Sequence, residues 1–153
     1  RSWRGGAEEQ PAASAHQLCR SRAGAGRGER AARERQATHA HGHGRVRQDP
    51  RLGPIFDREI ADDWDPHLAK LCDFWSSVML MTGRFKGQPM AVHSAIPDLE
   101  PAHFVRWLEL FDQTLREVCT PEAAAMFAAK AQMIGQSLQL GIAARRGELP
   151  PVT

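Results

Sequence analysis

The sequence predicts an all-α protein, because three stretches repeat apolar residues every three or four positions and no stretch alternates as a strand does. Each of these stretches also begins at a helix-start signal: an acidic pair, a proline, or a threonine followed by proline. The chain of 153 residues has room for one domain of ordinary size. We therefore expect one small helical domain with three substantial helices and shorter ones around them.

The first long helix is expected to begin near Trp64 and to end around Thr82 and Gly83. Asp62 and Asp63 precede it, and aspartate is favoured both as an N-cap and in the first turn of a helix. The apolar stripe of this helix has i, i+4, i+7 and i+11 spacing and consists of His67, Leu71, Phe74 and Val78.

Two shorter helical pieces flank this helix. Pro54, within residues 52–56, predicts a single helical turn or a corner. Pro89 suits the first position of a helix that carries His93, and Pro97 limits that helix to about two turns.

Two further long helices complete the predicted domain. One begins at Pro101, and its stripe consists of Phe104, Trp107, Leu108, Phe111 and Leu115. The other begins at Thr120, where a capping threonine is followed by proline and an acid, and is expected to end near Gly141.

Charge and large apolar residues are unevenly distributed along the chain. Residues 1–48 carry ten Arg, no Lys and four acids, and the only large apolar residues before Asp49 are Trp3, Leu18 and Val46. Such a stretch cannot offset the entropy cost of ordering itself. We therefore divide the chain into a low-complexity segment, residues 1–45, a helical domain, residues 46–143, and a C-terminal tail, residues 144–153.

Three interpretations of residues 1–45 stay open. The segment is a basic tail that contacts nucleic acid or another acidic surface, or inert disorder, or the product of a wrong reading frame or start, since GC-rich DNA read out of frame yields this Arg/Ala/Gly/His bias. We favour the third interpretation. Nucleic-acid binding ranks last because no aromatic residues are interleaved with the arginines.

Several classes of protein are excluded. No run of about 18 apolar residues is present to span a membrane, and no apolar stretch follows the first arginines as in a secretory signal. Cys19, Cys72 and Cys119 are odd in number, widely spaced and without a C-x-x-C motif. This pattern favours thiols in a reducing compartment over a disulfide framework or a zinc site, so we expect a cytoplasmic protein.

Two histidines lie among apolar neighbours on separate predicted helices, His67 on the first long helix and His93 on the short one. A buried imidazole needs a polar partner, so each could be a core histidine bonded to a backbone carbonyl. Together with the surrounding Phe and Trp residues, the pair also suits a flat apolar macrocycle with an axial imidazole. Periodicity alone does not separate these interpretations.

Five motifs occur in order between residues 46 and 142: G-P-I-F at 53–56, H-x-A-K at 67–70, D-F-W-S-S at 73–77, G-Q-P-M at 87–90 followed by His93, and H-F-x-R-W-L-x-L-F at 103–111. In these motifs the chain resembles the group III (P-type) truncated haemoglobins. The resemblance implies a two-over-two helical globin with one haem b, here with helices A and B degraded or missing.

The resemblance also implies roles for individual residues. His93 matches the proximal ligand of the haem iron, and His67 and Trp107 match the distal pocket, where the indole N–H of Trp107 can reach a bound ligand. The residues implied to line the haem are Leu71, Phe74, Phe85, Met90 and Phe111.

The chain departs from the family directly before Val46. The family's B helix carries a Phe-Tyr pair there, whereas this sequence has Gly42-His43 and contains no tyrosine. Two glycines and no apolar stripe make a poor helix. Either His43 replaces the tyrosine as a distal donor, or the first two helices are lost to a gene-model or frame error, which we favour.

Three functions are open at this point. The first is reversible binding of dioxygen or another diatomic ligand. The second is haem-dependent nitric oxide dioxygenation or peroxide chemistry, with electrons from an external reductase. The third is a haem-free helical interaction domain with a basic tail. Neither a membrane nor a nucleic acid is an expected partner.

Overall fold

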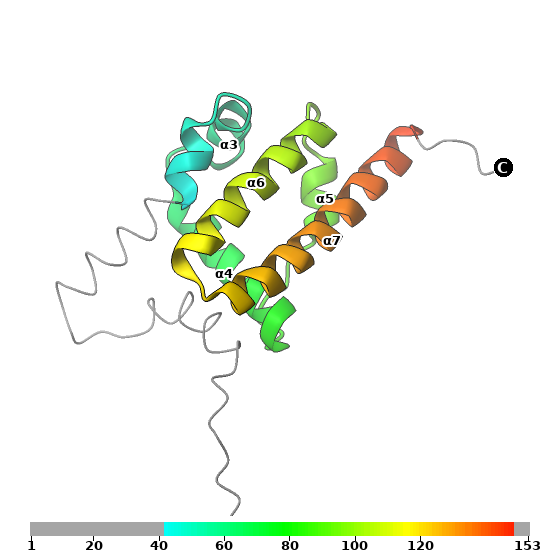
Figure 1. Cartoon of the computed structure of the whole chain (residues 1–153). Coiled ribbons are helices and arrows are strands. Elements are labelled where there is room, and N and C mark those ends of the chain that lie inside the picture. The colour runs from blue at the N-terminus through cyan, green and yellow to red at the C-terminus, as the bar shows by residue number, and fades with distance from the viewer. Residues whose placement is uncertain (1–41, 149–153) are drawn as a thin grey trace, which may run out of the picture.

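The computed structural model describes residues 42–148, and this range consists of helices and loops without strands (Figure 1). The all-α class is therefore confirmed. Residues 42–48 are helical, and the helices that follow are α3 (Gly53–Ile60), α4 (Trp64–Leu80), α5 (Pro89–Ser94), α6 (Pro101–Val118) and α7 (Pro121–Arg146).

Helices α6 and α7 form an antiparallel pair that packs across α4 (Figure 1). The short helix α5 packs on the C-terminal part of α7. Residues 42–48 and α3 lie beyond α6, on the side away from α7 (Figure 1). Helices α4 and α5, which carry the two histidines of interest, thus both pack against the α6–α7 pair.

The helix starts agree with the sequence signals. Proline occupies the first turn of α3, α5, α6 and α7. The side chain of Thr120 accepts a hydrogen bond of 3.4 Å from the backbone N–H of Ala123, as a capping threonine does. Asp63 stands at the N-cap of α4, but its side chain makes no capping hydrogen bond.

The predicted end of the last helix is wrong. Helix α7 passes through Gly141 and ends at Arg146, where Gly147 takes the left-handed conformation with φ of 71° that favours glycine. Gly141 lies inside the helix and does not end it. The side chain of Met90 packs against Gly141 so closely that a Cβ there would collide with the thioether. The first residues of the predicted tail, 144–153, are therefore helical.

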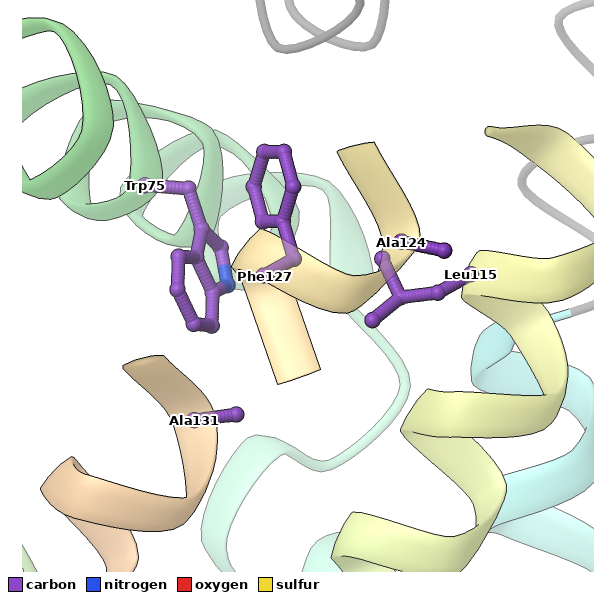
Figure 2. Close-up of a cluster of buried hydrophobic side chains, with 5 residues drawn as sticks. All are labelled: Trp75, Leu115, Ala124, Phe127 and Ala131. Carbon is purple, nitrogen blue, oxygen red and sulfur yellow. The ribbon is translucent and has the colours of Figure 1, made fainter. Parts of the chain in front are cut away.

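The main core joins α4, α6 and α7 around Trp75. Trp75 is 8% exposed, and Figure 2 shows its ring beside Phe127, with Leu115, Ala124 and Ala131 in the same cluster. The ring centroids of Trp75 and Phe127 are 5.3 Å apart. Burial of these side chains supplies the hydrophobic stabilisation that holds three helices together.

Residues 42–48 differ from the sequence expectation because they are helical despite Gly42 and Gly44. A second core accounts for this difference. Val46 and Leu52 are buried against Trp64 of α4 and Leu110 of α6, and such packing overrides weak helix propensity. The expectations for residues 1–41 and 149–153 lie outside the described residues.

Asp49 connects this N-terminal stretch to α6. Its carboxylate is buried and accepts hydrogen bonds from the backbone N–H groups of Arg51 (3.0 Å) and Leu52 (3.1 Å) and from Nε of Arg106 (2.6 Å). The turn that follows needs Gly53, because a Cβ there would collide with the carbonyl oxygen of Arg47. The G-P-I-F motif is thus fixed by a close backbone approach.

Asp49→Ala is expected to lower the free energy of unfolding by about 1–2 kcal/mol, because two backbone N–H groups lose their acceptor. Asp49→Asn is the matched control: it keeps an acceptor oxygen for the backbone and loses only the charge that faces Arg106. Urea unfolding at neutral pH should rank the wild type first, Asp49→Asn second and Asp49→Ala last.

The same residue predicts an acid-dependent loss of stability. Burial raises the pKa of Asp49, but the hydrogen bonds from Arg106, Arg51 and Leu52 outweigh it and hold the pKa below the usual 3.8. The unfolded chain therefore binds the proton first, so the stabilisation is complete above pH 3.8 and is lost as the pH falls further. Asp49→Ala should show a shallower loss over that range, and an unchanged acid transition would contradict this assignment.

Candidate functional site

The imidazole of His93 is held by its own helix. Its Nδ1 lies 2.7 Å from the backbone carbonyl oxygen of Pro89, one turn earlier in α5. Because a carbonyl oxygen only accepts, Nδ1 carries the proton and Nε2 keeps its lone pair. No other hydrogen bond to this ring occurs within residues 42–148. His93 is therefore oriented as a metal-ligating histidine is, with one nitrogen fixed and the other available.

Two neighbours fix where α5 presents His93. The thioether of Met90 seats α5 against Gly141 of α7, and the ring of Phe104, from α6, has its centroid 6.2 Å from that of His93. Met90 was predicted to line the haem, and the structure places the end of its side chain at the α5–α7 contact. Its role toward the haem stays a prediction.

His67 lies on α4 and is half-buried. The rings of Phe56 and Trp64 meet it edge-on, at centroid distances of 6.2 and 6.0 Å. Burial lowers the pKa of His67, and electrostatic interactions with Lys70 and His93 lower it further. His67 and His93 are thus within electrostatic reach of each other although they come from different helices.

Trp64 is a residue of the site that the sequence analysis did not assign. Its indole stacks with Phe56 at a centroid distance of 5.7 Å and contacts His43 at 5.5 Å. Its Nε1 is buried without a hydrogen-bond partner in the described part of the chain. The i, i+3 spacing from Trp64 to His67 could have indicated that both share one face of α4.

His43 therefore reaches the surroundings of His67 through the ring of Trp64. The rings of His43 and His67 both contact the indole of Trp64. The predicted role of His43 as a distal donor stays a prediction.

Trp107 belongs to a stack of three aromatic rings. Its ring lies on Phe111 at a centroid distance of 4.8 Å, and Phe111 lies on Trp75 at 5.2 Å. Trp107 also packs against the second core, next to Trp64. Its indole N–H has no hydrogen-bond partner among residues 42–148, so the group is available to a ligand.

The other predicted lining residues approach from α4 and the loop after it. Leu71 packs against Trp75, and the rings of Phe74 and Phe85 meet edge-on at 5.2 Å. The backbone N–H of Phe85 donates to Oγ of Ser77 at 2.9 Å, and this hydrogen bond holds the loop against the last turn of α4. A Cβ at residue 87 would lie 2.5 Å from the ring of Phe85, so glycine at this position lets the ring pack closely on the loop.

These residues fit a haem. The apolar side chains predicted to line the haem are only partly covered by protein, as walls of a ligand site are, and comprise Leu71, Phe74, Phe85, Met90 and Phe111. The imidazole of His93, with Nδ1 held by a backbone carbonyl, has the chemistry of an axial haem ligand.

Comparison with known proteins decides the family. No protein-family model matches the sequence. The group 3 truncated hemoglobin ctb of Campylobacter jejuni is 36% identical to this chain over 98 residues, which cover 62% of this chain and 77% of that protein. The chain belongs to the group 3 truncated haemoglobin family. The resemblance seen in the sequence motifs is therefore confirmed.

A solved structure supports the same assignment. The crystal structure of group III truncated hemoglobin from Campylobacter jejuni superimposes with a TM-score of 0.67 at 28% identity and covers 88% of this chain and 93% of that chain. Membership of this truncated haemoglobin family implies a globin-type haem-binding role and a haem cofactor. None of the described helices is long and apolar enough to cross a bilayer.

The stability of this truncated haemoglobin is expected to fall below pH 6.5 through His67. Because the pKa of His67 is lowered in the folded state from 6.5, the unfolded chain takes up the proton first as the pH falls. His67→Leu should therefore lose less stability than the wild type between pH 7 and pH 5, as measured by urea unfolding.

Lys70→Gln is the control for this prediction. It removes one of the charges that lower the pKa of His67, so its pH dependence should fall between those of the wild type and His67→Leu. Parallel pH profiles for all three proteins would show that His67 does not titrate in this way.

Proposed function

We propose that this truncated haemoglobin reversibly binds dioxygen, or another diatomic ligand, at the iron of a haem b that Nε2 of His93 holds. The observation that carries the proposal is the hydrogen bond from Nδ1 of His93 to the carbonyl of Pro89. This bond fixes the tautomer in which Nε2 is a ligand, and it makes the imidazole a better electron donor to iron.

When bound, the haem supplies an iron with one coordination position left for a small ligand. The protein contributes the surroundings of that position. The partly covered side chains of Leu71, Phe74 and Phe111 keep water away from it. A low local dielectric also strengthens any hydrogen bond made there.

Two side chains supply polar contacts on the side that faces away from His93. Trp107 and His67 each have a ring N–H or nitrogen without a protein partner in the described range. The lowered pKa of His67 keeps its imidazole neutral at physiological pH, so it can donate from one nitrogen without carrying a charge into the pocket. Either group can hydrogen-bond a polarised ligand.

His93→Gly is expected to abolish the iron–imidazole bond, because it removes the imidazole that carries the proposed ligand atom. Haemin titration followed by visible and resonance Raman spectra checks this, and added free imidazole should restore the five-coordinate ferrous spectrum. His67→Leu is the matched control, since it also removes a half-buried histidine but leaves His93 in place. The proposal would be contradicted by a wild-type chain that stays colourless with haemin, or by a His93→Gly variant with an unaltered spectrum.

Trp107→Phe is expected to speed dioxygen dissociation about tenfold, because a hydrogen bond to a polarised acceptor is worth about 1–2 kcal/mol. Phenylalanine keeps an aromatic ring on Phe111 and removes only the N–H donor. Stopped-flow measurement on the ferrous protein tests this. A dissociation rate equal to that of the wild type would show that the indole does not contact the ligand.

A further inference from the structure

The corner between α5 and α6, residues 95–100, is held by one side chain from the far end of the chain. Arg146, the last residue of α7, donates from Nη1 to the carbonyl oxygen of Leu99 at 2.9 Å. Its Nη2 donates to the carbonyl oxygens of Ile96 at 3.3 Å and Pro97 at 3.2 Å. One guanidinium therefore binds three backbone carbonyls of the α5–α6 corner.

This corner is connected directly to His93. The backbone N–H of Ile96 donates to the carbonyl oxygen of His93 at 3.2 Å, so Ile96 links the two residues: its N–H binds His93 and its carbonyl binds Arg146. Helix α5 ends at Ser94, so the carbonyls that Arg146 binds belong to the turn directly after the helix. Arg146 thus holds the turn that follows the helix carrying His93.

A second arginine reaches the same corner from α3. Arg58 makes a two-pronged ion pair with Asp98, at 2.7 and 3.1 Å. Both of these side chains are about half exposed, so water and salt weaken the pair. The bonds of Arg146 to Leu99 and Ile96 are partly buried, which makes Arg146 the stronger constraint.

Apolar packing alone leaves the corner's carbonyls unsatisfied. Ile96 and Leu99 are buried with Ile55 and Ile142, and this burial fixes the side chains of the corner. It does not provide donors for the three backbone oxygens that point at Arg146. The bonds to Leu99 and Ile96 are partly buried and the bond to Pro97 is exposed. Since partly buried carbonyls that lose their donor are destabilised, loss of the guanidinium should let the backbone of the corner rearrange.

We propose that Arg146 is a positioning residue for the iron ligand: through the α5–α6 corner it fixes the orientation of His93. The proposal rests on the proposed function, because it takes His93 as the ligand. It assigns the last turn of α7 a role in the site that no motif of the sequence indicates.

The test compares Arg146→Met with the wild type in the full chain. Methionine keeps an apolar stem of similar length and removes all donors. Amide hydrogen exchange, measured by mass spectrometry before and after haemin addition, is expected to speed up in residues 93–98. In the ferrous haem-loaded protein, the iron–histidine stretching band in resonance Raman spectra is expected to broaden, because the imidazole samples more orientations. Haem should dissociate roughly tenfold faster, as expected for the loss of charged hydrogen bonds.

Two further variants separate positioning from general loss of stability. Arg145→Gln changes the neighbouring arginine, which is exposed and makes no hydrogen bond in the described structure, and it should match the wild type in all three measurements. Arg146→Lys keeps the charge but can bind fewer carbonyls at once, so its values should fall between those of the wild type and Arg146→Met. It also keeps the test informative if Arg146→Met does not fold.

The outcomes distinguish this inference from the proposed function. A wild-type chain that binds no haem refutes the proposed function, and the exchange measurement still reports whether Arg146 holds the corner. A wild-type chain that binds haem through His93 upholds the proposed function. In that case an unchanged Raman band in both Arg146 variants, or the same broadening in Arg145→Gln, overturns the positioning role.

Discussion

The six-residue helix that carries His93 is the element on which the site depends. A helix of this length is not stable in isolation, because nucleation is unfavourable and few bonds follow it. Its position is instead imposed by α7, through the thioether of Met90 on Gly141 and the guanidinium of Arg146 on the following corner. The direction of His93, the proposed iron ligand, is therefore a property of the tertiary structure.

The proposed wall of the haem site is continuous with the core of the domain. Trp75 is buried at the junction of α4, α6 and α7, and the stack continues through Phe111 to Trp107, which is only partly covered. Changes at Trp107 thus act on packing as well as on the proposed ligand contact. A substitution that keeps an aromatic ring is needed to separate the two effects.

The segment before Val46 departs most from the family pattern. Its glycines disfavour a helix, yet residues 42–48 are helical because Val46 is buried against Trp64 and Leu110. The position that carries tyrosine in the family holds His43, whose ring contacts Trp64 rather than open space. An imidazole thus stands at this position, and it contacts α4 through Trp64.

The sequence by itself determined the fold class, the helix starts and the family. Prolines and a capping threonine specify where α5, α6 and α7 begin through local backbone chemistry, and the ordered motifs identify the truncated haemoglobins. Only the tertiary structure decided where α7 ends, why residues 42–48 are helical, and that Trp64 and Arg146 belong to the surroundings of the two histidines. These features depend on contacts between residues far apart in the chain, such as Met90 with Gly141, and periodicity within one helix carries no information about such contacts.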